Sequence, residues 1–269
     1  MKKINTSLII STYNWHEALD LCLKSIFAQS ITPSEILVAD DGSRDITRLL
    51  IQEISKNAPC PIVHVWQPDD GFKLAQIRNK AIAKSKYEYI IQIDGDLILH
   101  KYFIADHLFL AKERHFITGS RVLLSTETSQ LLLKNRSIDI EDHSSKKDDN
   151  LFNGLRIKFL QEFFADRYKQ SRSNKYYVKG CNMSFWREDL IDVNGYNENF
   201  LGWGREDSEI AIRLINSGIK KRFLKMGGVC HHIYHEEASR EMHERNTKIM
   251  NDAIDGNLTF IEKGLNQYL

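Results

Sequence analysis

Alternating apolar and amphipathic segments over the first 124 residues constrain the fold of this chain most strongly. Short apolar runs, typical of buried strands, alternate with segments in which apolar residues recur at helical spacing. The expected strands are 7–12, 35–40, 61–66 and 87–94, and the expected helices between them are 15–30, 46–54 and 74–85. A helix around 103–114 and a strand at 115–124 extend the pattern. Short connections predict an α/β domain whose mostly parallel sheet carries helices on both faces.

Charge and composition exclude several classes of partner. The chain has 37 Lys and Arg against 36 Asp and Glu, so no overall field favours nucleic acid. Its four cysteines form no CxxC pair, which is typical of reduced thiols in a cytosolic protein. The start "MKKINTSLII" lacks the apolar core of a signal peptide, and no run approaches the ~18 apolar residues that span a bilayer. We expect a cytoplasmic protein, with room for peripheral contact at the inner face of the cell membrane.

Residues 125–175 differ in composition from the segments before them. Residues 125–150 are polar and end in "IEDHSSKKDDN", which predicts a mobile loop. Residues 151–169 predict an amphipathic helix, with Phe152, Phe159 and Phe163 on its apolar side. That side could pack on the core or meet a membrane or another ligand, and the segment could close as a lid. We expect one continuous domain with parts at 1–124, 125–175 and 176–269.

Polar side chains follow three of the expected strands, at the edge where a parallel sheet binds its ligands. They are Ser11 and Tyr13 after the first strand, Asp40 and Asp41 after the second, and Asp94 and Asp96 after the fourth. Neither GxGxxG nor GxxxxGK[ST] follows the first strand, so the dinucleotide fingerprint and the P-loop are both missing. A diphosphate at this edge would need a different cradle, and a divalent cation is the obvious candidate.

The stretch "YIIQIDGDLIL", residues 89–99, reads as a buried strand that carries two carboxylates. An unpaired buried carboxylate is costly and normally protonates, unless a cation neutralises it. Residues two apart in an extended backbone point to the same side, and Gly95 lets the chain bend so that a metal and its phosphates come close. Hard oxygen ligands favour Mg²⁺ or Mn²⁺. A solvated turn is the alternative, but the apolar surroundings favour a metal site.

The ordered set of motifs resembles family 2 glycosyltransferases of the GT-A fold. The segments "STYNW", "VADDGSRD", "GFKLAQIRN" and "QIDGDL" have the order and approximate spacing of that family. The later "GYNENFLGWGREDSEIAIRL" is similar to the acceptor-side region of β-1,4-galactosyltransferases and bacterial chondroitin-type polymerases. The resemblance covers about residues 5–240. It implies that 1–124 binds a nucleotide sugar and 176–269 binds the acceptor.

The resemblance implies a uridine pocket lined by Ser11, Tyr13 and Asp41, and we place Asp40 on the same nucleotide side. A carboxylate can accept the N3–H of uracil, and a tyrosine can cover its ring. Asp41 would also suit the turn of "DDGS", and the two roles can coexist. The guanidinium of Arg78 suits pyrophosphate or base oxygens, with a solvated helix charge as the alternative.

The resemblance places Asp94 near the ribose or donor sugar and Asp96 on the metal. The segment "HHIYHEE" contains His231, His232 and His235, and histidines three apart can share a metal or stay unligated. In similar enzymes a histidine of this late segment completes the metal shell; His232 is slightly favoured here over His235. A zinc hydrolase is disfavoured because HExxH is absent.

The segment "GWGREDSE" carries the expected acceptor chemistry. Trp203 lies between Gly202 and Gly204 and offers a flat face to a sugar ring. Glu206 and Asp207 begin an expected helix, whose start favours their charged forms. The resemblance implies that Asp207 is the general base and that Glu206 hydrogen-bonds the acceptor. Ordinary first-turn acids are the alternative. We expect Trp203, Gly204 and Glu206 to contact the acceptor.

The expected activity is inverting, metal-dependent transfer of a hexose from a UDP-sugar to a saccharide acceptor, which could be lipid-linked. Galactose and N-acetylgalactosamine are favoured by "GWGRED", followed by glucose and N-acetylglucosamine. The strand "KGCNMSF" usually has two glycines in the family, and Cys181 replaces the second, which leaves the fit of the donor sugar there open. Two other hypotheses are a sugar nucleotidyltransferase, which would need an early glycine-rich signature, and a non-catalytic carbohydrate-binding protein.

Overall fold

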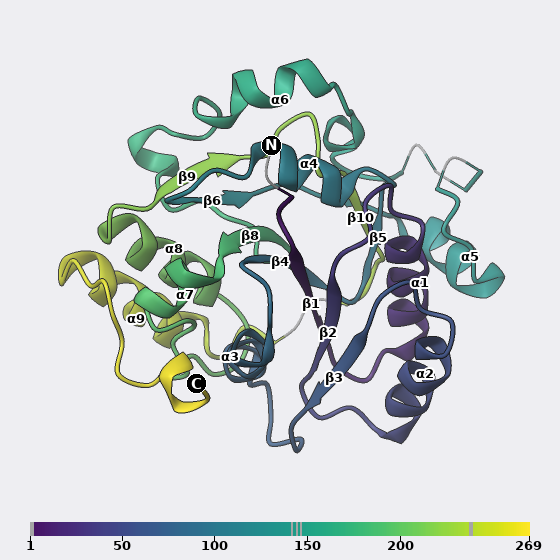
Figure 1. Cartoon of the computed structure of the whole chain (residues 1–269), viewed down its shortest axis with the longest axis horizontal. Helices are drawn as coiled ribbons and strands as arrows, with labels where there is room; N and C mark the ends of the chain where they lie inside the picture. The colour runs from purple at the N-terminus through teal and green to yellow at the C-terminus, as the bar shows by residue number, and fades with distance from the viewer. Residues whose placement is uncertain (1–2, 141, 144, 146, 237–238) are drawn as a thin grey trace.

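A seven-stranded sheet forms the centre of the computed structural model, which describes residues 3–140, 142–143, 145, 147–236 and 239–269 (Figure 1). In sheet order the strands are β3 (Ile62–Trp66), β2 (Glu35–Asp40), β1 (Thr6–Thr12), β4 (Tyr89–Asp94), β8 (Asn182–Trp186), β6 (His115–Thr118) and β9 (Lys220–Phe223). β1, β2, β3 and β4 are mutually parallel, β8 is antiparallel to β4 and β6, and β9 is parallel to β6. The predicted mostly parallel α/β sheet is confirmed.

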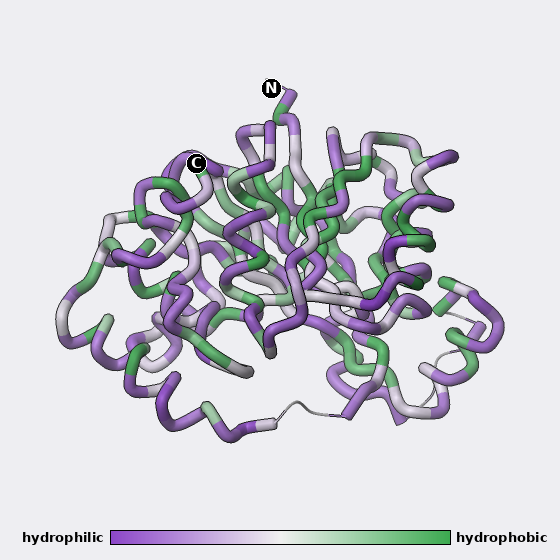
Figure 2. Tube along the Cα trace, turned by 90° about the horizontal axis from the view of Figure 1, so that it is seen from below, coloured by the Kyte–Doolittle hydropathy of each residue, from purple (hydrophilic) through white to green (hydrophobic). Residues whose placement is uncertain are grey.

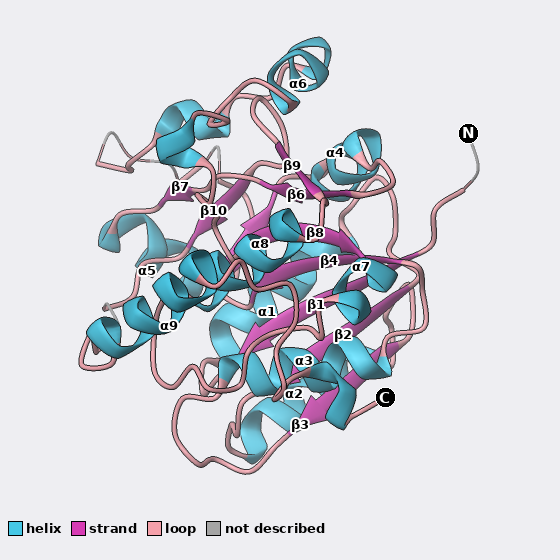
Figure 3. Ribbon diagram, turned by 90° about the vertical axis from the view of Figure 1, so that its left-hand side faces the viewer, coloured by secondary structure: helices cyan, strands magenta, loops and turns pink. Residues whose placement is uncertain are grey.

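Helices cover both faces of this sheet, as the alternating segments predict. One face carries α1 (His16–Phe27), α2 (Asp45–Ser55) and α4 (Phe103–Leu110), and the other carries α3 (Leu74–Lys84), α7 (Arg187–Asp192) and α8 (Glu206–Asn216). Figure 3 shows α3, α7 and α8 in front of the strands. Side chains alternate along a strand, so Leu8 and Ile10 of β1 pack under α1 and α2, whereas Ile9 packs on the side of α3 and α8. The apolar segments gather in the middle of the molecule (Figure 2).

A second, three-stranded sheet lies beside the first and changes the interpretation of residues 89–99. Its order is β5 (Leu97–Leu99), β10 (Cys230–His232) and β7 (Val122–Leu123). The run expected as one strand is therefore broken: β4 ends at Asp94, and β5 begins at Leu97 in the other sheet. The N–H of Gly95 donates to the carbonyl of Ser11 at 2.8 Å, which holds the break against β1. The "DGD" sequence is thus the turn between two sheets.

The expected polar loop at 125–150 contains a helix, which corrects the prediction. Helix α5 spans Thr126–Asn135, and the hydroxyl of Ser125 caps it by accepting the Thr128 N–H. Leu132 packs α5 into a small core with Ile98 and Ile233, although the segment is mostly polar. Residues 141, 144 and 146 of the expected loop lie outside the described residues, as do 1 and 2 of the N-terminal segment. The mobility of the loop stays a prediction.

The expected helix at 151–169 is shorter than predicted, and its apolar side faces solvent. A 3₁₀ turn, η1, spans Leu151–Gly154, and α6 spans Lys158–Ala165. Phe159 and Phe163 are exposed, whereas Gln161 and Ala165 are the buried residues of α6. The prediction that the apolar side packs on the core is therefore wrong. Helix α6 lies outside α4 and β9, at the top of Figure 1.

The C-terminal elements close the α8 face. Helix α9 (His243–Asp255) packs on α8, and the 3₁₀ turn η3 (Leu265–Gln267) reaches α3. A further 3₁₀ turn, η2, spans Arg172–Asn174. In the part of the chain that the structure describes, no helix combines the length and apolarity needed to cross a bilayer.

A buried ion pair fixes α8 to the loop before it. Arg213 and Glu209 are both fully buried and hydrogen-bonded to each other at 2.7 and 2.8 Å. The guanidinium also donates to the carbonyls of Val193 and Gly195. The pair therefore holds the helix that begins at Glu206 in a defined position.

Replacing Arg213 alone should be strongly destabilising, because Glu209 would remain charged and unpaired in the core. We expect Arg213→Met to lower the free energy of unfolding by about 3–5 kcal/mol in urea denaturation. Glu209→Met combined with Arg213→Met should recover part of that loss. Arg48→Met, which breaks an exposed pair, should cost less than about 1 kcal/mol. Equal losses in the single and double variants would contradict this account.

Candidate active site

The side chain of Arg78 connects the predicted nucleotide edge with the predicted acceptor segment. It extends from α3 and is 1% exposed. Its Nε donates to the Ser11 hydroxyl at 3.2 Å, its Nη2 to Asp94 at 3.1 Å and its Nη1 to Asp207 at 2.8 Å. The guanidinium also lies over the ring of Tyr196, 5.2 Å from its centroid. One buried cation thus joins residues from β1, β4 and α8.

Burial and mutual repulsion shift the ionisation of the acids around Arg78. Desolvation raises the pKa of Asp94, and Arg78 opposes that shift. Desolvation, with the nearby charge of Asp207, raises the pKa of Glu206 to about 8. Glu206 Oε1 lies 3.6 Å from Arg78, and its buried Oε2 has no hydrogen-bond partner in the described part of the chain. Desolvation thus favours the neutral form of Glu206 and opposes the effect expected from the helix start.

The residues predicted to bind the nucleotide differ in exposure, and both Ser11 and Asp41 are buried. Tyr13 is half-exposed, and its hydroxyl donates to Asp69 at 3.0 Å. Asp41 accepts hydrogen bonds from the Gln67 side chain at 2.5 Å and the Lys73 N–H at 2.8 Å. Desolvation raises the pKa of Asp41, although both of these donors lower it.

Asp40 lies below this surface. It is 0% exposed, and its two oxygens are bonded to the Ser43 N–H and to His64, both at 2.8 Å. A side chain buried in this way holds the turn after β2 and is not placed to touch a nucleotide. The expected nucleotide contact of Asp40 therefore needs correction.

Asp96, His232 and His235 lie together, as a metal site would require. Each offers one ligand atom, and the three atoms lie within 4.8 Å of one another. Asp96 Oδ2 is 3.3 Å from His232 Nε2 and 3.2 Å from His235 Nε2. Burial alone would raise the pKa of Asp96, but the two histidines lower it below its ordinary value. Asp94 and Asp96 therefore have different partners, although only Gly95 separates them.

Two details of this cluster fit a bound cation. Asp96 Oδ1 is buried and has no hydrogen-bond partner among the described residues. His235 Nδ1 donates to the carbonyl of Glu236 at 2.7 Å, so a neutral ring directs the lone pair of Nε2 at the Asp96 carboxylate. Two electron pairs facing each other need a proton or a cation between them. A carboxylate and two imidazoles form a ligand set that suits a divalent first-row transition metal.

The segment predicted to bind the acceptor leads directly into α8. Gly204 and Arg205 both have positive φ, 107° and 75°, which turns the chain sharply before Glu206. A Cβ at position 180 would overlap the Asp207 carboxylate, so Gly180 is required for Asp207 to lie where it does. Trp203 is 43% exposed and stacks on His243, with ring centroids 6.2 Å apart.

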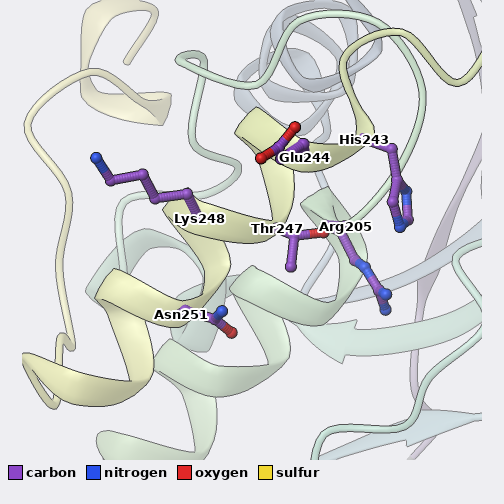
Figure 4. Close-up of a pocket in the computed structure, with 6 residues that line it drawn as sticks. All are labelled: Arg205, His243, Glu244, Thr247, Lys248 and Asn251. Atoms are coloured by element: carbon purple, nitrogen blue, oxygen red, sulfur yellow. The ribbon is translucent and has the colours of Figure 1, made fainter.

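A cavity of about 480 Å³ lies beside this segment, between the start of α8 and α9. It is lined by Arg205, His243, Glu244, Thr247, Lys248 and Asn251 (Figure 4). Lys248 extends to the opposite side from Arg205 and His243 in that view. Buried nitrogen and oxygen atoms of His243 and Thr247 have no hydrogen-bond partner in the described chain. The cavity therefore offers free polar groups next to Trp203.

Sequence reasoning missed Arg121 as a site residue. It lies just before β7, and its guanidinium donates to the sulfur of Cys181 at 3.2 Å. Burial would lower the pKa of Arg121, but Cys181, Asp94 and Asp96 raise it. Cys181, at the position where the family usually has glycine, thus contacts a cation near both carboxylates. A lone arginine in "TGSRVLL" carries no motif that could have signalled this position.

Two family models match the chain. The model described as "Glycosyl transferase family 2" matches residues 7–192, and the one described as "N-terminal domain of galactosyltransferase" matches residues 162–236. The chain is 26% identical over 242 residues to chondroitin synthase of Pasteurella multocida, covering 86% of this chain and 25% of that protein. It is 26% identical over 239 residues to chondroitin synthase of Escherichia coli, covering 84% and 34%. The chain thus spans about a quarter to a third of these relatives.

A solved structure shares the fold. A mannosyltransferase from Pyrobaculum calidifontis, in complex with GDP-Man and Mn²⁺, superposes with a TM-score of 0.59 at 18% identity, covering 88% of this chain and 59% of that one. The predicted GT-A fold is confirmed by this likeness. Because the first family model spans well over half of the sequence, the chain belongs to glycosyl transferase family 2.

Proposed function

We propose that this glycosyltransferase domain moves a hexose from a UDP-sugar to a saccharide acceptor, with a divalent metal and with inversion at the anomeric carbon. The observation that carries the proposal is a pair of polar clusters that adjoin at the Asp94-Gly95-Asp96 turn. Asp96, His232 and His235 form one cluster, and Arg78 joins Asp94 to Asp207 in the other. Donor-side and acceptor-side groups meet there, as a transfer between two bound sugars requires.

The proposed donor sugar is galactose or N-acetylgalactosamine, followed by glucose or N-acetylglucosamine. The match of residues 162–236 to the galactosyltransferase model supports this order, as do the chondroitin synthase relatives. Ser11, Tyr13 and Asp41 are proposed to bind the uridine. Asp94 is proposed to contact the ribose or the donor sugar.

Asp96, His232 and His235 are proposed to hold Mn²⁺ or Mg²⁺, with Mn²⁺ better suited to two imidazole ligands. When bound, the cation would supply positive charge against the diphosphate leaving group. Gly95 suits the turn between Asp94 and Asp96, since a Cβ there would lie 3.1 Å from the Ser11 carbonyl oxygen. Arg121, on the same side, is proposed to add a second positive charge near the phosphates.

Asp207 is proposed as the general base. Arg78 donates to its Oδ1, while Oδ2 makes no hydrogen bond in the described part of the chain. Oδ2 is therefore free to take the proton of the acceptor hydroxyl as that oxygen attacks the anomeric carbon. The UDP–sugar bond breaks in the same displacement. With a single base and no carboxylate nucleophile assigned, one displacement and inversion follow.

The acceptor is proposed to lie against Trp203 and Gly204, with Glu206 beneath it. A protonated Glu206 can donate a hydrogen bond to an acceptor oxygen, which a carboxylate cannot do. The cavity lined by Arg205 and His243 would receive the next residue of a saccharide chain. A lipid-linked saccharide is the proposed form of the acceptor.

Removing a proposed metal ligand should weaken binding before any chemistry occurs. We expect Asp96→Ala to reduce the Mn²⁺-dependent affinity for UDP by at least about 10–100-fold in titration calorimetry. His235→Ala should act in the same direction. Asp45→Ala, an exposed acid on α2, is the matched control and should bind as the wild type does. Unchanged Mn²⁺ affinity in Asp96→Ala would remove this residue from the metal site.

Asp207→Asn should separate binding from transfer. Asparagine keeps the shape of the side chain but cannot accept the acceptor proton. We expect UDP and Mn²⁺ to bind normally, while UDP release in the presence of donor and acceptor falls by about 10²–10⁴-fold. A screen of UDP-sugars against simple glycosides provides the assay. A fall of less than about tenfold would assign the base to another residue.

Glu206 should make stability depend on pH. Its pKa is 4.5 in the unfolded chain and about 8 in the folded one, so the wild type loses stability as the pH rises between these values. Glu206→Gln keeps a neutral group and escapes that loss. In thermal unfolding measured across this pH range, the Tm of Glu206→Gln should rise relative to that of the wild type as the pH increases. Glu53→Gln changes an exposed acid, and its Tm should vary with pH as that of the wild type does. If the Tm of Glu206→Gln also followed the wild type at every pH, the raised pKa of Glu206 would be contradicted.

A further inference from the structure

The most unusual surface of the molecule is formed by η1 and α6. Phe159, Phe152 and Phe163 are 79%, 77% and 54% exposed, and Leu151 and Leu155 are exposed beside them. We call these five residues the phenylalanine face. Soluble proteins seldom expose so many large apolar side chains along one short segment. The sequence pattern is that of a helix with a partner on its apolar side, and no partner covers it within the described residues.

Polar contacts on the opposite side of α6 keep the phenylalanine face turned outward. The side-chain amide of Gln161 donates to the Met226 carbonyl at 3.0 Å. Arg222 is 3% exposed and donates to Glu162 at 2.6 Å and to Asp166 at 3.0 Å. Rotating α6 to bury its phenylalanines would break these contacts and leave the Arg222 charge unpaired. The exposure of the face is therefore a property of the fold.

The surroundings of the face are positively charged. The exposed cations of the same segment are Lys158, Arg167, Arg172 and Lys175. Among the described residues, none of these four has a carboxylate within ion-pair distance. The segment's two acids, Glu162 and Asp166, are both engaged by Arg222. An apolar face in a segment that also exposes cations is complementary to a surface that is apolar inside and anionic outside.

We infer that the phenylalanine face docks this domain onto an anionic lipid bilayer. The phenylalanines enter the boundary between headgroups and acyl chains, and the four cations meet lipid phosphates. A second copy of the chain fits the face less well, because a symmetric pairing would bring the same unpaired cations together. The contact is peripheral, because no described helix is able to span the membrane.

The docking face lies next to the proposed donor site, although the inference does not rest on the proposed function. η1 packs against β7, which pairs with the strand that carries His232. The side-chain amide of Asn153 in η1 donates to the Arg121 carbonyl at 2.9 Å. A bilayer bound at α6 would therefore hold lipid-borne saccharides close to the metal cluster.

Vesicle flotation of the whole chain tests the inference. We expect the wild type to float with vesicles of phosphatidylglycerol and phosphatidylcholine, less in high salt, and not with phosphatidylcholine alone. Phe159→Ser combined with Phe163→Ser should weaken binding by at least about tenfold, because two apolar anchors are lost. Lys158→Gln with Arg167→Gln should reduce the preference for anionic lipid. Phe260→Ser changes a half-exposed phenylalanine elsewhere and should bind as the wild type does.

Three results would overturn the inference. They are no flotation of the wild type with anionic vesicles, equal flotation of the Phe159→Ser/Phe163→Ser variant, and equal binding to neutral and anionic lipid. A wild-type dimer in sedimentation that this variant dissociates, without vesicle binding, would assign the face to a second copy instead. Unchanged circular dichroism and Tm exclude misfolding, which is not expected for substitutions of exposed side chains.

Discussion

The buried guanidinium of Arg78 is the interaction on which the rest of the site depends. It is removed from water and surrounded by Asp94, Asp207 and Glu206, and it donates hydrogen bonds to the first two. The same cation joins α8 to the edge of the parallel sheet. Without it, several acids would face one another in a desolvated space, and some would protonate. The position of the proposed base is thus inseparable from the charge balance of the core.

The break between β4 and β5 organises the donor side. A continuous strand would carry Asp94 and Asp96 through the middle of one sheet. The chain instead leaves one sheet at Asp94 and enters another at Leu97, so the two acids lie where both sheets end. His232 ends β10 in the second sheet, directly opposite Leu97, and His235 follows it. The proposed metal site therefore forms where two sheets meet, and the buried Asp96 Oδ1 there has no hydrogen-bond partner among the described residues.

The buried polar groups of the protein differ in whether their hydrogen bonds are satisfied inside the protein. Polar groups whose bonds are all satisfied inside the protein, such as Arg213 with Glu209 and Asp40 with His64, hold the scaffold. Among the buried polar atoms left without partners in the described chain, those of Asp96, Glu206 and His243 lie beside the surfaces proposed for metal and acceptor. Unsatisfied buried groups are costly, and ligands would satisfy them. The exposed phenylalanines of α6 are the apolar counterpart, since they too lack a partner within the described chain.

The sequence by itself determined the order of strands and helices in the first 124 residues, because the periodicity of apolar residues is local. It also placed Ser11, Asp41 and Asp94 at one edge, since parallel strands end together. Only the tertiary structure decided that Arg78 bonds Asp207, 129 positions away, that Arg121 faces Cys181, and that Asp40 is internal. It also decided that α6 turns its apolar side to solvent. These outcomes depend on contacts between distant segments, and local pattern carries no information about which side of an element its neighbours will occupy.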